Sequence, residues 1–554
     1  MMIFMKKIFA ALLLVSLMFD FAYAQVERKE IDIEAYGEHV QVFNVGKEGV
    51  VFFYPLEKGF KRDKNQKYRL QAFDKELEAS WSQEFSMSTK MTLLKFQQSN
   101  LNLFLLFGKT KGGDEYRVMN ISLVDGEVVS KTGSSDRLLK APVTDFDLVS
   151  TNMVLHAQEK EYPVSYLIDP YSGRIRQVGD ENTYTGDFSQ RVGTGINRDN
   201  SGYWDFVNEL GGAAKYSLKM TEYDGAGQKL NVRDVVLGSG IMMNSVELKS
   251  IANGDQYILG SFGSYKLGKL KKSKDPFTIS TNEDLGFIFG KIRGDGNMLF
   301  MNSIELKQIK SFVDMARQIP SLDEQFEELE SKKKRVKSPG ILNPLDEERF
   351  LTHSFKFHSV YDVDPLTKIV AVEFFHPEAN YAENELPELP LIMQRREEMI
   401  CMEAEDLVEA KTRGVRSSAL LVMAFNNIDG SLLWDYAIKL DGVIMDDAKQ
   451  RAKLVCTPGQ VVLAYGADNT VVTKTLQQGA VVDNAITSVP APNEEGGRKR
   501  KSKGVITSGL TPWYDNLFIQ YEYSQVKVKK SRSKSKKKKK RKTTYSFTIL
   551  PVYN

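Results

Sequence analysis

The five histidines are the first residues of this chain whose chemistry could serve catalysis or metal binding. His353 and His358 are five positions apart, and this odd spacing places two side chains on opposite faces of a strand. His376 lies near Glu373 and Glu378, but no close-spaced pair of histidines or cysteines accompanies it. Because structural metal sites need such pairs, the sequence predicts no metal centre.

The segment 383–409 is rich in carboxylates, with nine against Arg395 and Arg396. Carboxylates bind Ca²⁺ well, but the segment lacks the Asp-x-Asp-x-Asp-Gly spacing of a dedicated calcium loop. We therefore expect a solvated acidic face rather than a cation site.

The sequence contains no complete motif for a catalytic nucleophile or for nucleotide binding. Gly193-Thr194-Gly195 begins a Gly-x-Gly-x-x-Gly pattern, but Arg198 stands where the third glycine is required. We nominate no catalytic residue, and the sequence leaves any cofactor unknown. A site gathered from distant strands would leave no local motif, so an enzyme remains an alternative.

The two cysteines, Cys401 and Cys456, could form a disulfide if the chain is exported to an oxidising compartment. They could equally stay as free buried thiols, because a chain of this size needs no covalent link to form a core. Both alternatives stay open. Two cysteines cannot supply the four ligands of a structural zinc site.

The most unusual chemical feature is a basic run near the C-terminus, in which 12 of the 16 residues from 527 to 542 are Lys or Arg. The stretches 517–523 and 545–550 on either side alternate in polarity like strands. We therefore predict a β-hairpin whose connecting loop carries this charge, which is too dense to pack in a core. The candidate polyanion-binding residues are Lys527, Lys529, Lys530, Arg532, Lys534, Lys536, Lys537, Lys538, Lys539, Lys540, Arg541 and Lys542.

The N-terminal 24 residues resemble an export signal. Lys6 and Lys7 precede an apolar stretch of about 12 residues, and Ala22-Tyr23-Ala24 forms a small-residue cleavage site. The stretch is short for a membrane anchor, which needs roughly 20 residues. We expect cleavage after Ala24, a periplasmic or extracellular protein, and no transmembrane span in the mature chain.

The rest of the chain consists of short strand-like stretches that must position any site. Five of them share a strand, an Asp-containing turn and a second strand, with turns at Asp74, Asp125, Asp169, Asp224 and Asp429. The first four turns are about 50 residues apart, which is the length of one four-stranded propeller blade. The sequence therefore predicts an all-β protein.

The segment 425–434, in which an Asp-Gly turn is followed by Leu-Leu-Trp, resembles the blade hairpin of PQQ-like and WD40-like β-propellers. The segment 73–81 is a weaker copy without the glycine. This resemblance implies a propeller architecture and no particular activity. We expect one propeller of seven or eight blades, with tandem β-sandwich domains as the structural alternative.

Residues 304–340 interrupt the β pattern. Leu306, Ile309, Val313 and Ala316 have helical spacing, and Ser321 opens a second predicted helix lined by Leu322, Phe326 and Leu329. We expect a helical insertion that projects from the ring. The expected organisation is a signal peptide at 1–24, blades at 25–303, the insertion at 304–340 and further blades at 341–554.

Three functions remain open at this point. The leading expectation is an exported, non-enzymatic binding or scaffold protein of the bacterial cell envelope. The second is binding to polyanions or anionic membrane surfaces through the lysine loop, and the third is a propeller enzyme such as a quinoprotein-like dehydrogenase or a hydrolase. We expect a protein or an envelope polyanion (lipid phosphate or anionic polysaccharide) as partner rather than a small molecule, with nucleic acid less favoured because the run holds no aromatic side chain for stacking.

Overall fold

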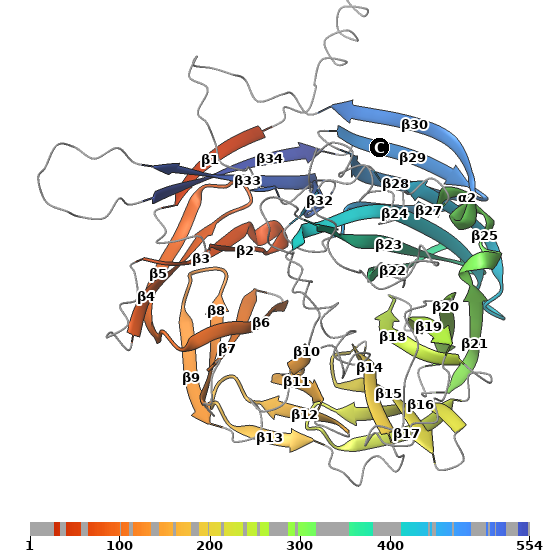
Figure 1. Cartoon of the computed structure of the whole chain (residues 1–554), viewed down its shortest axis with the longest axis horizontal. Coiled ribbons are helices and arrows are strands. Elements are labelled where there is room, and N and C mark those ends of the chain that lie inside the picture. Colours follow the sequence, from red (N-terminus) through yellow and green to blue (C-terminus); the bar gives the residue numbers. More distant parts are fainter. Residues whose placement is uncertain are drawn as a thin grey trace, which may run out of the picture.

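The computed structural model is an all-β ring (Figure 1). It describes residues 27–33, 40–56, 65–99, 101–109, 115–134, 143–158, 162–178, 188–197, 199–211, 215–235, 241–251, 255–264, 286–293, 297–316, 354–379, 412–440, 444–445, 450–467, 470–488, 506–507, 510–515, 517–527 and 541–551.

The first three blades are separate four-stranded antiparallel sheets. Blade 1 contains β2 (Gln41–Asn44), β3 (Val50–Pro55), β4 (Asn65–Phe73) and β5 (Ala79–Ser88), with a short 3-10 turn η1 (Gly46–Glu48). Blade 2 contains β6 (Met91–Ser99), β7 (Asn102–Lys109), β8 (Glu115–Ser122) and β9 (Val128–Ser134). Blade 3 contains β10 (Val143–Val149), β11 (Asn152–Gln158), β12 (Pro163–Ile168) and β13 (Ile175–Val178).

Blades 4 and 5 are joined into one eight-stranded sheet. Blade 4 contains β14 (Phe188–Ile196), β15 (Gly202–Gly211), β16 (Lys215–Asp224) and β17 (Lys229–Val235), and blade 5 contains β18 (Ile241–Ser250), β19 (Gln256–Ser264), β20 (Gly286–Ile292) and β21 (Met298–Glu305). The first strands of the two blades, β14 and β18, pair in parallel at Gly193 and Val246. A Cβ on Gly193 would overlap the Val246 carbonyl oxygen, so this close approach of the two strands requires the glycine.

The last three blades occupy the C-terminal part of the chain. Blade 6 contains β22 (Ser354–Asp364), β23 (Thr367–Ala379), β24 (Thr412–Asn426) and β25 (Leu432–Lys439), and blade 7 contains β27 (Ala452–Thr457), β28 (Gln460–Ala467), β29 (Thr470–Gln477) and β30 (Ala480–Ser488). Blade 8 contains β32 (Thr511–Pro512), β33 (Leu517–Lys527), β34 (Arg541–Pro551) and the N-terminal β1 (Glu27–Ile33). Two short strands, β26 (Ile444–Met445) and β31 (Ile506–Thr507), link β24 of blade 6 to β33 of blade 8.

The ring is closed by strands from the two ends of the chain. β1 pairs antiparallel with β34 over seven residues, from Glu27 opposite Ile549 to Ile33 opposite Thr543. Four separate sheets, two blades in the eight-stranded sheet and two in the ten-stranded sheet give eight blades among the described strands. The expected propeller is therefore confirmed, and the alternative of tandem β-sandwiches is wrong.

The five sequence hairpins all turn from the third to the fourth strand of a blade. Several of these turns pack on the outermost strand of the preceding blade. The Gly126 backbone lies against the Trp81 ring, and the Trp81 indole donates a hydrogen bond to the Leu123 carbonyl at 2.9 Å. Gly430 meets Phe300 in the same way, and Gly479, in the corresponding β29–β30 turn of blade 7, meets Trp434. These turns thus pack against aromatic side chains of the preceding blade.

The described part of the helical insertion does not project as we expected. It forms a 3-10 turn η3 (Leu306–Gln308) and a short helix α2 (Lys310–Ala316). Leu306, Ile309, Phe312 and Met315 are buried in the apolar cluster between blades 5 and 6. The sequence pattern predicted Leu306 and Ile309 correctly, but its second half was off by one residue: Phe312 and Met315 are buried, while Val313 is half-buried. The second predicted helix lies outside the described residues.

Among the described residues, no helix has the length and apolar character that a membrane crossing requires.

We expect Gly126→Ala to destabilise the protein by about 2 to 4 kcal/mol, because φ is positive and a Cβ would meet the Trp81 ring at 2.6 Å. Gly459→Ala is the matched control, since Gly459 has a similar positive φ with no neighbouring atom within 4 Å. It should cost about 1 kcal/mol. Denaturant unfolding of both variants measures the difference. Equal losses would contradict the proposed packing of turn on blade.

Candidate functional site

The structure describes only the two ends of the predicted lysine loop. Lys527 ends β33, and Arg541 and Lys542 begin β34. Lys527 is directly opposite Arg541 in the antiparallel ladder, so the hairpin prediction is correct and the ladder reaches into the basic run. The other nine candidates lie outside the described residues, namely Lys529, Lys530, Arg532, Lys534, Lys536, Lys537, Lys538, Lys539 and Lys540.

The base of this hairpin is firmly anchored in the ring. The register between β33 and β34 runs from Leu517 opposite Pro551 to Lys527 opposite Arg541. The Phe52 ring of blade 1 packs edge-on against Tyr545 and Phe547, with centroid distances of 5.1 and 5.8 Å. In Figure 1 the two strands extend outward past β1 at the left of the ring. The two strands that flank the basic segment are therefore paired with each other and packed against an aromatic ring of blade 1.

Of the two cysteines, the structure describes Cys456 alone. Cys456 lies half-buried on β27, while Cys401 is outside the described residues. Burial raises the pKa of the Cys456 thiol to about 12, and the nearby charge of Asp362 adds to the effect. Cys456 is thus a poor nucleophile at neutral pH.

Two buried histidines, each bonded to a carboxylate, lie near contacts between neighbouring blades. His358, a residue of the Thr352–His358 stretch, lies on β22 and its Nε2 is 2.9 Å from Glu373 Oε1. His156 lies on β11, and its partners Asp147 and Ser165 lie nine positions away on the two neighbouring strands, a spacing that matches no catalytic or metal-binding motif. His376 lies on β23, where it pairs with Arg416, and His353 lies outside the described residues. Among the described residues, no cluster of three or more His, Cys, Asp or Glu could hold a metal.

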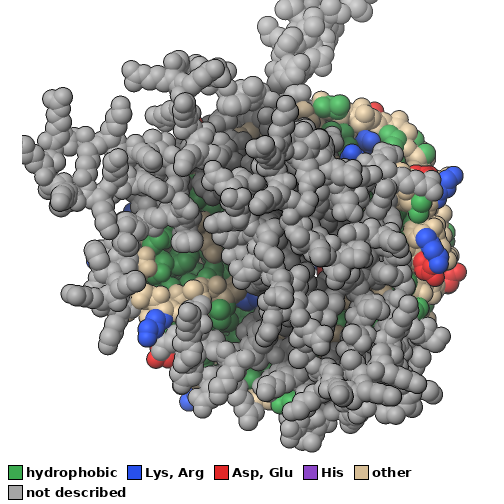
Figure 2. Space-filling view, in the orientation of Figure 1, with side chains coloured by type: hydrophobic (Ala, Val, Ile, Leu, Met, Phe, Trp, Pro, Cys, Tyr) green, Lys and Arg blue, Asp and Glu red, His purple; other side chains and the backbone are tan. Residues whose placement is uncertain are grey.

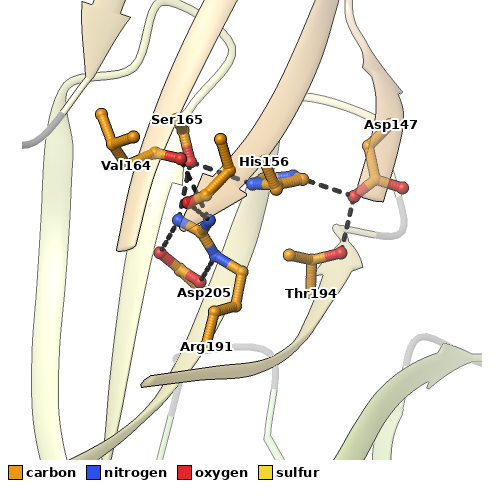
Figure 3. A network of polar contacts seen from close by, with 8 residues as sticks. Asp147, His156, Val164, Ser165, Arg191, Thr194 and Asp205 are labelled. Carbon is orange, nitrogen blue, oxygen red and sulfur yellow. Dashed lines mark hydrogen bonds and ion pairs between the residues drawn. The ribbon is translucent and has the colours of Figure 1, made fainter. Parts of the chain in front are cut away.

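Figure 3 shows the network around His156, where strands of blades 3 and 4 meet. His156 Nδ1 lies 2.9 Å from Ser165 Oγ, and its Nε2 lies 3.2 Å from Asp147 Oδ2. The Thr194 hydroxyl of blade 4 donates to the same Asp147 oxygen at 2.8 Å. Three neighbouring strands of one blade thus supply a serine, a histidine and an aspartate in hydrogen-bonded order.

Arg191 of β14 links this array to blade 4. Its Nε and Nη2 donate to the two carboxylate oxygens of Asp205 at 2.6 and 2.8 Å, a bidentate pair. Its Nη1 donates to the carbonyls of Ala157 and Val164, and Nη2 also donates to Ser165 Oγ at 3.0 Å. One guanidinium therefore bonds to two strands of blade 3 and one strand of blade 4.

This arrangement has the order of a Ser-His-Asp triad but lacks access for a substrate. His156 is fully buried and Ser165 is 3% exposed. The Ser165 oxygen is already occupied by Arg191 and His156, so no attacking position is left open. We interpret the network as a polar contact that fixes blade 3 to blade 4.

A second buried carboxylate fixes blade 6 to blade 7. Glu373 of β23 is fully buried. Its oxygens accept backbone N–H bonds from Arg451 and Ala452, at 2.8 to 3.0 Å, where the chain enters β27. The Arg451 side chain, also fully buried, donates to the Gly466 carbonyl within blade 7. The glutamate therefore sets where the first strand of blade 7 begins.

Comparisons with known proteins report only distant similarity. No family model and no curated protein matches the chain. A solved prolyl endopeptidase matches with a TM-score of 0.33 and 9% identity over 84% of this chain, which spans only 51% of that chain. The WD40 domain of SCAP from fission yeast gives 0.33 and 7%, covering 82% of this chain and 98% of that one. The β-propeller domain of the Trilobed protease from Pyrococcus furiosus gives 0.30 and 7%, covering 78% and 92%.

We expect Asp205→Asn to destabilise the protein by about 3 to 5 kcal/mol, because it leaves the buried Arg191 guanidinium without its counterion. Glu84→Gln is the matched control, since it breaks the half-exposed pair with Arg69 and should cost less than about 1 kcal/mol. Denaturant unfolding at neutral pH measures both. Similar losses would mean that Arg191 and Asp205 do not link the blades.

The pKa of the Asp147 carboxyl gives a pH-dependent prediction. Burial raises this pKa, but the hydrogen bond and charge of His156, the Thr194 hydroxyl and the Arg191 charge outweigh burial and lower it. A lowered folded-state pKa adds stability above the unfolded value of about 3.9, and this stability is lost as the pH falls through the folded-state pKa. Asp147→Asn should therefore destabilise the protein at pH 7 by more than at pH 3. A constant difference in unfolding free energy would contradict this prediction.

Proposed function

We propose that the protein is an exported, non-enzymatic binding protein of the bacterial cell envelope, in which the propeller holds a basic hairpin loop against an anionic surface. The observation that supports this proposal best is the β33–β34 register, which places Lys527 opposite Arg541. Both ends of the segment 528–540 are therefore fixed at the tip of one ladder.

The position of the hairpin in blade 8 favours a binding role for the loop. β1 holds β34 on one side, and β31 and β32 hold β33 on the other. A loop on such a base loses little further freedom in its supporting strands when it binds. The ring thus acts as a scaffold for the basic loop.

The composition of the loop favours polyanions as ligands. Residues 528–540 contain nine Lys or Arg and no carboxylate. Near an anionic membrane surface each basic residue contributes roughly 1 kcal/mol. Aromatic residues are missing from this run, so base stacking adds nothing and single-stranded nucleic acid is less favoured. Phosphate-rich lipid or anionic polysaccharide fits this chemistry best.

The test replaces residues 528–540 by a neutral Gly/Ser loop of equal length. Binding to vesicles with and without anionic lipid, and to heparin, is measured at 50 and 200 mM salt. The parent should bind anionic vesicles, and its affinity should fall at least about tenfold between the two salt concentrations. The neutral variant should bind weakly at both.

A shuffled loop with the same residues in a different order is the matched control. It should bind like the parent, because the attraction depends on charge and not on sequence. Equal binding by the parent and the neutral variant would disprove the proposal. Heparin binding without vesicle binding would favour anionic polysaccharide over lipid phosphate.

A further inference from the structure

Arg117 is a half-buried cation at the junction of blades 1 and 2. It lies on β8 and faces blade 1, since Met119 and Ile121 on the same face of that strand belong to the apolar cluster between these blades. Among the described residues, no carboxylate pairs with its guanidinium, not even Glu115 two positions earlier on this face. Burial alone lowers the pKa of Arg117, and the guanidinium stays charged. Its charge is therefore not neutralised within the described part of the chain.

The guanidinium is held between the two blades in a fixed orientation. Its Nε donates to Ser130 Oγ of β9 at 2.6 Å, and its Nη1 donates to the Ser86 carbonyl of β5 at 2.8 Å. Its central carbon lies 5.6 Å from the centre of the Phe85 ring. These contacts use one N–H on each of two nitrogens, whereas an arginine also has two N–H groups on its third nitrogen. The Nη2 atom is therefore left to bind a ligand.

The positive charge of Arg117 is not needed for these two hydrogen bonds. A neutral amide side chain can donate hydrogen bonds of the same kind without the cost of burying part of a charge. That cost is offset when an opposite charge lies close by. Arg69 of blade 1 has such a partner in Glu84, but Arg117 has none among the described residues. An oriented guanidinium without a counterion is the arrangement that a bound anion requires.

Two half-buried aromatic rings extend the site beyond Arg117. Phe85 stacks on Tyr68, its partner across β4 and β5, with ring centres 6.0 Å apart and planes inclined by 19°. The buried Phe53 ring stacks against both of them. The Tyr68 hydroxyl donates to Gln66 Oε1 at 3.2 Å, which places polar groups at the edge of the rings. Because Tyr68 and Phe85 are partly exposed, a ring-shaped ligand that covers them would bury further apolar area.

These contacts suit a sugar ring that carries one carboxylate. A single guanidinium balances a single negative charge, whereas a phosphate monoester carries nearly two. Sugar rings present C–H groups on their faces and hydroxyl groups at their edges. The faces match the aromatic rings, and the edges match the amide of Gln66 and the hydroxyl of Thr132, an exposed residue directly opposite Arg117 in the ladder.

We propose that Arg117, Tyr68 and Phe85 form a binding site for a carboxylate-bearing sugar, such as a uronic acid, between blades 1 and 2. Arg117 binds the carboxylate, and the two aromatic rings pack against the sugar ring. The two blades are neighbours at the left of the ring in Figure 1. This proposal does not rest on the proposed function, because it involves neither β33 nor β34.

The test is a calorimetric titration of the full chain with D-glucuronate at constant ionic strength. D-glucose and acetate are the comparison probes, because glucose has the ring without the charge and acetate has the charge without the ring. The parent should bind glucuronate, and it should bind each comparison probe more weakly. Equal affinities for glucuronate and acetate would overturn the proposal, because the aromatic rings would then contribute nothing.

Arg117→Gln should lower the affinity for glucuronate at least about tenfold, because hydrogen bonds to a charged group are lost. Arg69→Gln is the matched control, since it removes an arginine that is already paired with Glu84, and it should leave the affinity unchanged. Arg117→Lys keeps the charge but lacks the planar guanidinium, so it should also bind more weakly than the parent. It serves as the second variant if Arg117→Gln does not fold.

The variant with a neutral loop at 528–540 separates this site from the basic loop. It should bind glucuronate with the affinity of the parent, whatever its behaviour toward vesicles and heparin. Loss of glucuronate binding in this variant would overturn the proposal, because the sugar would then be held by the loop. A parent that does not bind glucuronate, or an equal affinity in the parent and the Arg117 variants, would overturn it as well.

Discussion

The pairing of β1 with β34 is the constraint on which the rest of the ring depends. The two strands come from opposite ends of the chain, and together with β32 and β33 they make the eighth blade. Ile31, Ile33 and Phe547 bury their side chains in one cluster with Phe52 of blade 1. If β1 separated, this cluster and an unpaired strand edge would meet water, which makes separation costly. Closure therefore combines backbone pairing with burial of a shared core.

Once the ring is closed, neighbouring blades are held together in more than one way. Apolar clusters fill the spaces between them, and several third-to-fourth strand turns rest on the preceding blade. At two junctions, buried charged groups also fix how one blade is oriented against the next. These groups are Arg191 with Asp205, and Glu373 with the start of β27. Such groups contribute little net stability compared with apolar residues, but each requires a particular partner geometry. They set which position each blade adopts.

The sequence predicted the repeating elements well, because hairpins are local. The Asp-Gly turn at 429–430 and the turn at Asp125 mark real blade hairpins, since their chemistry depends on a few adjacent residues. The link from Arg191 to this network could not be predicted, because Arg191 and Asp205 belong to blade 4 and reach Ser165 of blade 3 only where the two blades meet. The role of Gly193 was likewise hidden, since its partner Val246 is 53 positions away. Turn chemistry set by adjacent residues could therefore be predicted from the sequence, whereas contacts between distant strands could not.

The hairpin that carries the basic loop contains an internal conflict. Lys527 stands directly opposite Arg541, and like charges in that position oppose strand pairing. The ladder nevertheless reaches this pair, supported by the aromatic contacts of Tyr545 and Phe547 with Phe52 and by β1 along its outer edge. An anion bound between Lys527 and Arg541 would reduce this repulsion, so by linkage such binding and the pairing of these two residues would strengthen each other. The closing strand and the proposed binding element are thus coupled through the single ladder that they share.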